Sequence, residues 1–244
     1  MQFIKTLAAT LLIMLANIPL NANAALIFNL DTRFSNTTDP AGTAPWLRAT
    51  FAQNGANNVR LTMENLLQDT DEFVSLWGFN LDPNIVDFTA LSVVNNASLT
   101  TNTGSSATVA KDVDVKNAGS GGFYDIVFDF DIAPPGDRFI SGQKVVFDLT
   151  MIGLDEADFD FLASQQGGSG PFKTAAHIQG IGPNAGLSTY VGTTTSGDGG
   201  GGGGGGGGPQ DIPEPASLLL LAMGLLGLGG LRRHKAHSTS LPLS

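Results

Sequence analysis

Residues 123–132 read Phe-Tyr-Asp-Ile-Val-Phe-Asp-Phe-Asp-Ile, and their alternation decides the fold class of this chain. Apolar side chains recur at every second position from Tyr124 to Ile132, and aspartates gather on the other parity. Because successive side chains of a strand point to opposite faces, the stretch predicts a β-strand with aromatic rings in a core and aspartates in water. Pro134 and Gly136 then end the strand and turn the chain.

The same alternation recurs on both sides of this strand. We expect Lys144–Met151 to be its antiparallel partner. Asn, Gly and Asp-Pro turns separate the other candidate strands, which are Ala25–Leu30, Trp46–Gln53, Asn58–Asn65, Phe73–Leu81, Phe88–Val94, Ala107–Val115 and Thr174–Gln179. Short strands at this spacing predict an all-β fold, an antiparallel β-sandwich of jelly-roll or immunoglobulin-like type. A short helix or helical turn is expected at Leu154–Gln165.

The first 24 residues have the pattern of a secretory signal peptide. Lys5 precedes an apolar stretch, and the small-residue ending Ala22-Asn23-Ala24 predicts a cut after Ala24. The chain has no cysteine, which excludes disulfide scaffolds, thiolate metal sites, cysteine nucleophiles and lipid attachment through cysteine. We therefore expect an exported protein that folds without covalent cross-links.

Acidic residues dominate the charge of the chain, whose formal net charge is −10. The predicted exported part is more acidic still, because Lys5 and the basic residues near the C-terminus lie outside it. Such a surface argues against nucleic acid and anionic lipid as partners, and it favours solubility or divalent cations.

The C-terminal segment has three parts in a fixed order. The triplet Pro213-Glu214-Pro215 precedes an uncharged apolar run at 216–231, and Arg232, Arg233 and Lys235 follow. A helix can begin at Pro215 but does not easily extend upstream of it. The run would be about 24 Å long as a helix, somewhat short of a hydrocarbon core of about 30 Å. It predicts a marginal single transmembrane helix, and the positive-inside rule makes 236–244 a cytoplasmic tail.

This arrangement resembles the PEP-CTERM sorting signal of Gram-negative bacteria that make extracellular polysaccharide. In that family the membrane enzyme exosortase recognises the signal and is thought to cut it near the Pro-Glu-Pro motif. The resemblance implies that Pro213, Glu214, Pro215, Arg232 and Arg233 are recognition residues of a substrate. It also implies the secretion translocon, exosortase and, in transit, the inner membrane as partners, with the cell surface or extracellular space as destination.

Ten consecutive glycines at 199–208 predict a flexible linker before the sorting signal. A phosphate-binding glycine loop is excluded, because no strand leads into the run and no helix with Lys-Ser or Lys-Thr follows it. The predicted division of the chain is a signal peptide at 1–24, a β-sandwich domain at 25–192, a linker at 193–212, a sorting signal at 213–235 and a tail at 236–244.

Catalytic motifs are sparse in the predicted exported domain. His177 is its only histidine, and no Gly-x-Ser-x-Gly elbow accompanies it, so we expect a structural role. Aspartates on the wet face of strands account for most of the carboxylate pairs, whereas a glycosidase needs two that converge across a sugar. We therefore expect a protein that is not an enzyme.

The residues are compatible with two kinds of binding site, one for calcium and one for carbohydrate. Asp155, Glu156, Asp158 and Asp160 supply the oxygen ligands that calcium prefers, although they lack the spacing of an EF-hand loop and solvated acidity is the competing interpretation. No other cofactor is indicated. Exposed aromatic rings often bind carbohydrate on β-sandwiches. The best candidates for exposure are Trp46 and Tyr190, because Trp77 and Tyr124 lie in alternating runs that are typical of a core.

The function that these patterns and the resemblance favour is that of a non-enzymatic protein sorted by exosortase to the cell surface or extracellular matrix. There it would associate with exopolysaccharide or with other matrix proteins of a biofilm. Two alternatives from other classes stay open, a carbohydrate-binding module and a glycan-acting hydrolase.

Overall fold

The computed structural model describes residues 25–36, 38–85, 87–101, 107–133, 138–164 and 169–198. The chain forms two compact units, Met1–Gly199 and Gly200–Ser244, and every described residue belongs to the first.

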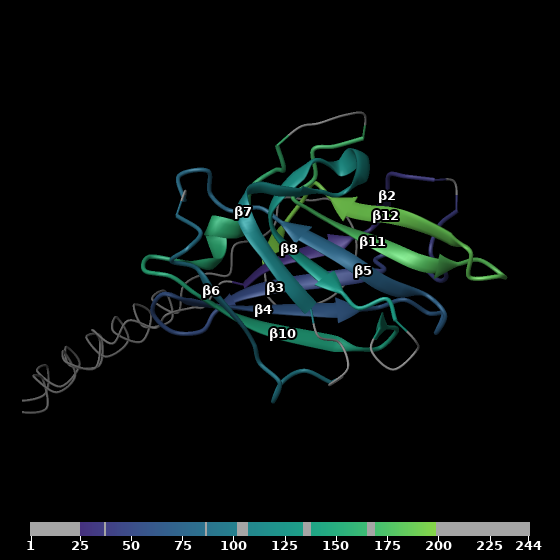
Figure 1. The fold of residues 1–244 in the computed structure, drawn as a ribbon, viewed down its shortest axis with the longest axis horizontal. Coiled ribbons are helices and arrows are strands. Elements are labelled where there is room, and N and C mark those ends of the chain that lie inside the picture. Colours follow the sequence, from purple (N-terminus) through teal and green to yellow (C-terminus); the bar gives the residue numbers. More distant parts are fainter. Residues whose placement is uncertain are drawn as a thin grey trace, which may run out of the picture. The chain divides into compact units, whose positions relative to one another are not determined.

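Two antiparallel sheets make up the described domain (Figure 1). The first, sheet A, has the order β13 (Gly197–Asp198), β1 (Ala25–Leu30), β3 (Leu47–Gln53), β4 (Asn58–Asn65), β10 (Lys144–Thr150) and β6 (Ser92–Asn95). The second, sheet B, has the order β2 (Thr32–Arg33), β12 (Leu187–Thr193), β11 (Thr174–Ile181), β5 (Phe73–Phe79), β8 (Phe123–Phe130) and β7 (Ala107–Asn117), and β9 (Phe139–Ile140) also pairs with β5. The predicted all-β class is confirmed.

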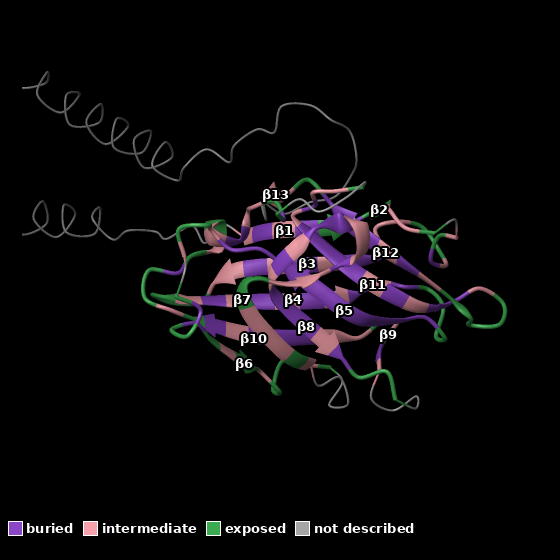
Figure 2. Ribbon diagram, turned by 45° about the horizontal axis from the view of Figure 1, so that its top comes forward, coloured by how far each residue is buried: buried purple, intermediate pink, exposed green. Residues whose placement is uncertain are grey.

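The two sheets pack face to face around an aromatic core. Phe51 of sheet A meets Phe79 of sheet B edge to face, with ring centroids 5.1 Å apart. Phe51 also stacks on Phe159 at 4.2 Å, and Phe159 ends the short 3-10 helix η2 (Glu156–Phe159). Buried residues fill the inward positions of the strands, whereas exposed ones gather in the turns (Figure 2). The architecture is therefore that of a β-sandwich.

A second, smaller apolar cluster covers the outer face of sheet B. It contains Leu76, Val127, Ala175 and Tyr124, and the ring of Tyr124 lies over Gly78. The alternation along 123–132 predicts Tyr124 in a core, and its side chain is fully buried. It lies in this second cluster, however, and not with Ile126 between the sheets; the pairing of β8 with β7 is irregular between these two residues. Strand β5 is consequently buried along its whole length.

The predicted pairing of 123–132 with Lys144–Met151 is also wrong. Strand β8 lies in sheet B between β5 and β7, whereas β10 lies in sheet A between β4 and β6. The two strands face each other across the core, where the rings of Phe128 and Phe147 are 4.7 Å apart. Both strands bury one face against the same core. Alternation in the sequence indicates that one face is buried, but it does not indicate which strand is the hydrogen-bonded neighbour.

Other strand predictions differ from the structure mainly at their ends. Ala25–Leu30 and Asn58–Asn65 are strands over the predicted residues, but β8 ends before Ile132, which is exposed rather than in the core. The predicted strand at Phe88–Val94 is reduced to Ser92–Asn95. Four strands were not predicted, namely β2, β9, β12 and β13. The helix expected at Leu154–Gln165 is the single turn η2.

The two ends of the described domain meet on sheet A. β13 pairs with the start of β1 through Leu26 with Asp198 and Ile27 with Gly197. Ala25, the first residue after the predicted signal-peptide cut, already belongs to β1. β13 itself falls within the segment assigned to the linker.

Replacing Phe51 by alanine tests the importance of the inter-sheet core. We expect Phe51→Ala to lower the free energy of unfolding by about 3–5 kcal/mol, because a fully buried ring that contacts both sheets is lost. Urea unfolding of the purified protein measures the change. Thr50→Ala, on the outward parity of the same strand, is the matched control and should change it by less than about 1 kcal/mol.

Candidate functional site

A cavity of about 300 Å³ lies where the chain leaves β5. Three aspartates line it, Asp82, Asp114 and Asp125, together with Asn80, Ser164 and several apolar side chains. We call it the acidic cavity. Its wall comes from the residues after β5, from β7, from β8 and from the segment before Ser164, so four distant parts of the chain converge there.

Asp125 is the most firmly held of these carboxylates. The backbone N–H of Leu81 donates to its Oδ2 at 3.0 Å, and that of Asp114 donates to its Oδ1 at 2.9 Å. Burial raises the pKa of Asp125 above its usual value; the two backbone hydrogen bonds oppose this change, and the nearby charge of Asp114 adds to it. The protonated form of Asp125 is therefore easier to reach than that of an ordinary surface aspartate.

An irregularity in β7 brings Asp114 beside Asp125. The pairing of β7 with β8 shifts between Lys111 and Lys116, and Asp114 adopts a left-handed backbone with φ of 51°. Ser164 Oγ donates to Asp114 Oδ1 at 2.5 Å, which ties β7 to the far wall of the cavity. The irregular strand thus supplies one wall of the site as well as an edge of the sheet.

The acidic cavity can hold a ligand through carboxylate oxygens, or it can use two adjacent carboxylates for proton transfer. Among the described ranges, no group of three or more His, Asp or Glu side chains has an arrangement that could hold a metal ion.

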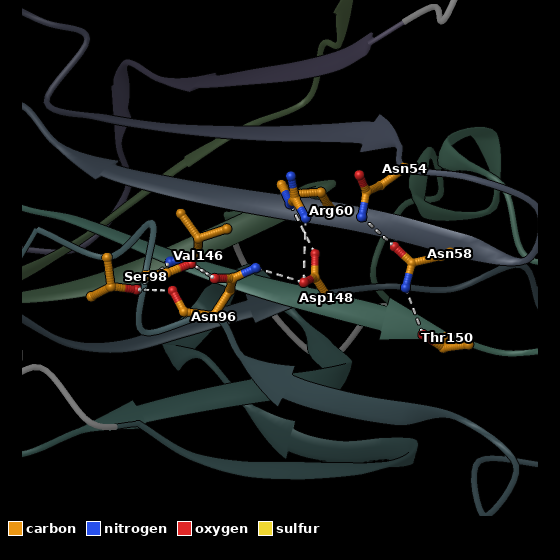
Figure 3. Close-up of polar contacts among 9 residues, drawn as sticks. Asn54, Asn58, Arg60, Asn96, Ser98, Val146, Asp148 and Thr150 are labelled. Atoms are coloured by element: carbon orange, nitrogen blue, oxygen red, sulfur yellow. Dashed lines mark hydrogen bonds and ion pairs between the residues drawn. The ribbon is translucent and has the colours of Figure 1, made fainter.

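A polar network on the outer face of sheet A is the main alternative site (Figure 3). Arg60 Nε donates to Asp148 Oδ1 at 2.8 Å, and Asn96 Nδ2 donates to Asp148 Oδ2 at 2.8 Å. Burial acts to raise the pKa of Asp148, but the hydrogen bonds from Arg60 and Asn96 and the charge of Arg60 lower it overall. Asp148 is thus occupied by partners from β4 and from the turn after β6.

The other side chains of this network also hydrogen-bond to one another. Asn54 donates to Asn58 Oδ1 at 2.9 Å, and Asn58 donates to Thr150 Oγ1 at 2.7 Å (Figure 3). Ser98 donates to Asn96 Oδ1 at 2.7 Å. Because these groups bind one another across neighbouring strands and turns, the network stabilises sheet A.

The acidic cluster suggested for calcium does not assemble as ligands. Asp155 caps η2 by accepting from Ala157 N–H at 2.9 Å, and Asp158 Oδ2 accepts from Asp155 N–H at 2.9 Å. Asp160 forms an ion pair with Lys173. With Glu156 these residues build and flank a capped turn, so the structure gives the calcium hypothesis no geometric support.

The two aromatic residues suggested for carbohydrate contact are poorly placed for it. Trp46 is only 6% exposed and belongs to the core, so the expectation that it is exposed is wrong. Tyr190 is partly exposed, but its ring stacks on His177 at 4.4 Å and lies 5.8 Å from that of Phe34. Trp46 is thus out of reach of a sugar, and the ring of Tyr190 is already stacked on His177.

His177 lies on the outer face of sheet B beside Tyr190. Its Nδ1 is 2.9 Å from Ser75 Oγ, and burial lowers its pKa. Within the described part of the chain no carboxylate hydrogen-bonds to its ring, so the pair lacks the acidic member of a Ser-His-Asp triad. The contacts of His177 are those of a packed side chain.

The predicted sorting residues Pro213, Glu214, Pro215, Arg232 and Arg233 lie outside the described residues, as do the signal peptide and the transmembrane helix at 216–231. Within the described ranges, no helix has the length and apolar character needed to span a bilayer.

Sequence reasoning missed the acidic cavity. It placed Asp125, with the other aspartates of 123–132, on the wet face of a strand. The sequence signal that could have suggested a site was weak: charged residues interrupt the alternation of 107–117, which is typical of an irregular strand.

Comparison with known proteins identifies one segment. A family model described as the PEP-CTERM protein-sorting motif matches residues 211–233. No curated protein and no solved structure matches the chain. The match thus concerns the C-terminal segment and leaves the ligand of the β-sandwich to be inferred from its own geometry.

The raised pKa of Asp125 predicts a pH-dependent contribution to stability. For a raised pKa, that contribution is fully present below the unfolded value of about 3.8 and is lost as pH rises through the folded value. Asp125→Asn cannot ionise, so its free energy of unfolding relative to wild type should increase between about pH 3 and pH 7. Urea unfolding at a series of pH values measures this difference, and a difference that is constant with pH would contradict the assignment.

Proposed function

From the PEP-CTERM protein-sorting motif at residues 211–233 we propose that this chain is an exported, non-enzymatic protein that exosortase sorts to the surface or extracellular matrix of a Gram-negative bacterium. Its β-sandwich would associate there with exopolysaccharide. The motif is the observation that carries the proposal, because it implies export and processing by exosortase in the membrane.

The proposed route begins at the secretion translocon, where signal peptidase removes residues 1–24. The apolar run at 216–231 then holds the chain in the inner membrane while exosortase recognises Pro213, Glu214 and Pro215. The order of the chain supports this route: the strands of the described domain end at Asp198, and a glycine-rich stretch separates them from the motif. A flexible linker of this kind lets a membrane enzyme reach the motif without meeting the folded domain.

Two features of the domain are compatible with an exported polysaccharide-binding protein. It is a sandwich that folds without cysteine, and its acidic cavity offers carboxylate oxygens beside apolar surface. Sugars present both hydroxyl donors and apolar C–H faces, so a site of this mixed character supports association with polysaccharide.

A glycan-acting hydrolase is the second candidate, because Asp114 and Asp125 line one cavity and the pKa of Asp125 is raised. Glycosidases use such a pair, one carboxylic acid and one carboxylate. Release of reducing ends from exopolysaccharide by the wild type, and its loss in Asp125→Asn, would favour the hydrolase over a binding protein. We expect neither the wild type nor Asp125→Asn to release reducing ends.

Intact mass spectrometry of protein recovered from the cell surface or medium tests the route. In a host that has exosortase we expect a form that begins at Ala25 and ends near Pro213 to Pro215. Glu214→Ala should abolish this form, whereas Pro209→Ala, in the linker, should leave it unchanged. Recovery of protein that still carries Arg232 and Arg233, both with and without exosortase, would reject the proposal and make the segment an ordinary membrane anchor.

A further inference from the structure

The chemistry of the acidic cavity indicates which kind of polysaccharide it would take. We propose that the cavity binds a sugar residue that carries a protonated amine, as in a polysaccharide of deacetylated amino sugars. This inference rests on the proposed association with exopolysaccharide and specifies its ligand class.

The polar part of the cavity lining consists mainly of hydrogen-bond acceptors. The carboxylates of Asp82, Asp114 and Asp125 line it, and no lysine or arginine is among its described lining residues. Its hydroxyl, that of Ser164, already donates to Asp114. A ligand must therefore supply the donors, and a cationic donor gains most because hydrogen bonds between charged partners are the stronger ones.

Asn80 adds a buried acceptor to this wall. It is 3% exposed, and its Nδ2 donates to the carbonyl oxygen of Lys173 at 3.0 Å and to that of Phe161 at 3.4 Å. In the described part of the chain, nothing donates to its Oδ1. This oxygen is one more acceptor at the cavity for a ligand that carries donors.

The apolar part of the cavity suits the C–H face of a sugar ring. Val113 and Leu162 line it while remaining 57% and 51% exposed, and Phe88 and Ile85 also line it. Exposed aliphatic side chains beside carboxylates resemble the mixed lining of ligand sites. The volume of about 300 Å³ matches a small ligand such as a single sugar residue rather than a folded partner.

Competing ligands fit less well. A uronic acid would bring a carboxylate against three aspartates, which is unfavourable. A metal ion would need converging ligands, and the described residues hold no such group. The two lysines near the cavity do not neutralise it, because Lys111 donates to the carbonyl oxygens of Phe88 and Leu91, and Lys173 pairs with Asp160.

Calorimetric titration of the processed protein with three oligosaccharides of equal length tests the inference. The probes are a β-1,4-glucosamine oligomer, its N-acetylated counterpart and an oligogalacturonate. We expect the free-amine oligomer to bind at least about tenfold more tightly than the N-acetylated one, because acetylation removes the charged donor. Oligogalacturonate should not bind.

Two pairs of variants locate the site. Asp114→Asn should weaken binding of the free-amine oligomer at least about tenfold; asparagine tolerates the left-handed backbone of this position, so the fold is kept. Asp112→Asn, on the same strand but not in the cavity, should bind like wild type. Leu162→Lys should abolish binding by placing a cation at the exposed rim, whereas Val94→Lys, at an exposed position of β6, should not.

The outcomes separate this inference from the proposed function. Equal affinity for the N-acetylated oligomer would overturn the amino-sugar assignment. Unchanged binding in both Asp114→Asn and Leu162→Lys would place the site elsewhere while polysaccharide association stood. A different result would reject the proposed function: the protein would not be cleaved in an exosortase-dependent way, although its cavity still bound the glucosamine oligomer.

Discussion

Contact between aromatic rings across the two sheets is the interaction on which the rest of the structure depends. Phe51 meets Phe79 of the opposite sheet and also stacks on Phe159, so one side chain joins sheet A, sheet B and η2. Because the chain has no cysteine and therefore no disulfides, apolar burial of this kind is the principal stabilising term for the sandwich.

The same contact reaches the acidic cavity through η2. Stacking on Phe51 holds Phe159 in the core, and the preceding residue, Asp158, accepts a hydrogen bond from Asp82 N–H through its carbonyl oxygen at 2.8 Å. Asp82 is thereby placed on the cavity wall. The position of a surface carboxylate thus follows from core packing, which explains how a site can lie on loops and still be well defined.

Sequence reasoning succeeded where the deciding information is local. Alternation located Ala25–Leu30 and Asn58–Asn65, and the order of triplet, apolar run and basic cluster predicted the sorting motif that the family model matches. It failed where distant segments decide: strand 123–132 was given the wrong neighbour, and Trp46 was expected at the surface. The cavity escaped prediction for the same reason, because Asp114 and Asp125 meet only through an irregular strand pairing.

The pairing of β13 with β1 has a mechanical consequence. Tension applied to the domain from its C-terminal side is transmitted first through Gly197 and Asp198, which pair only with Ile27 and Leu26. Peeling this two-residue strand breaks few hydrogen bonds and leaves the sheets and their aromatic core intact. We therefore expect β13 to detach from β1 under load while the two sheets stay folded, and to pair with β1 again when the load is released.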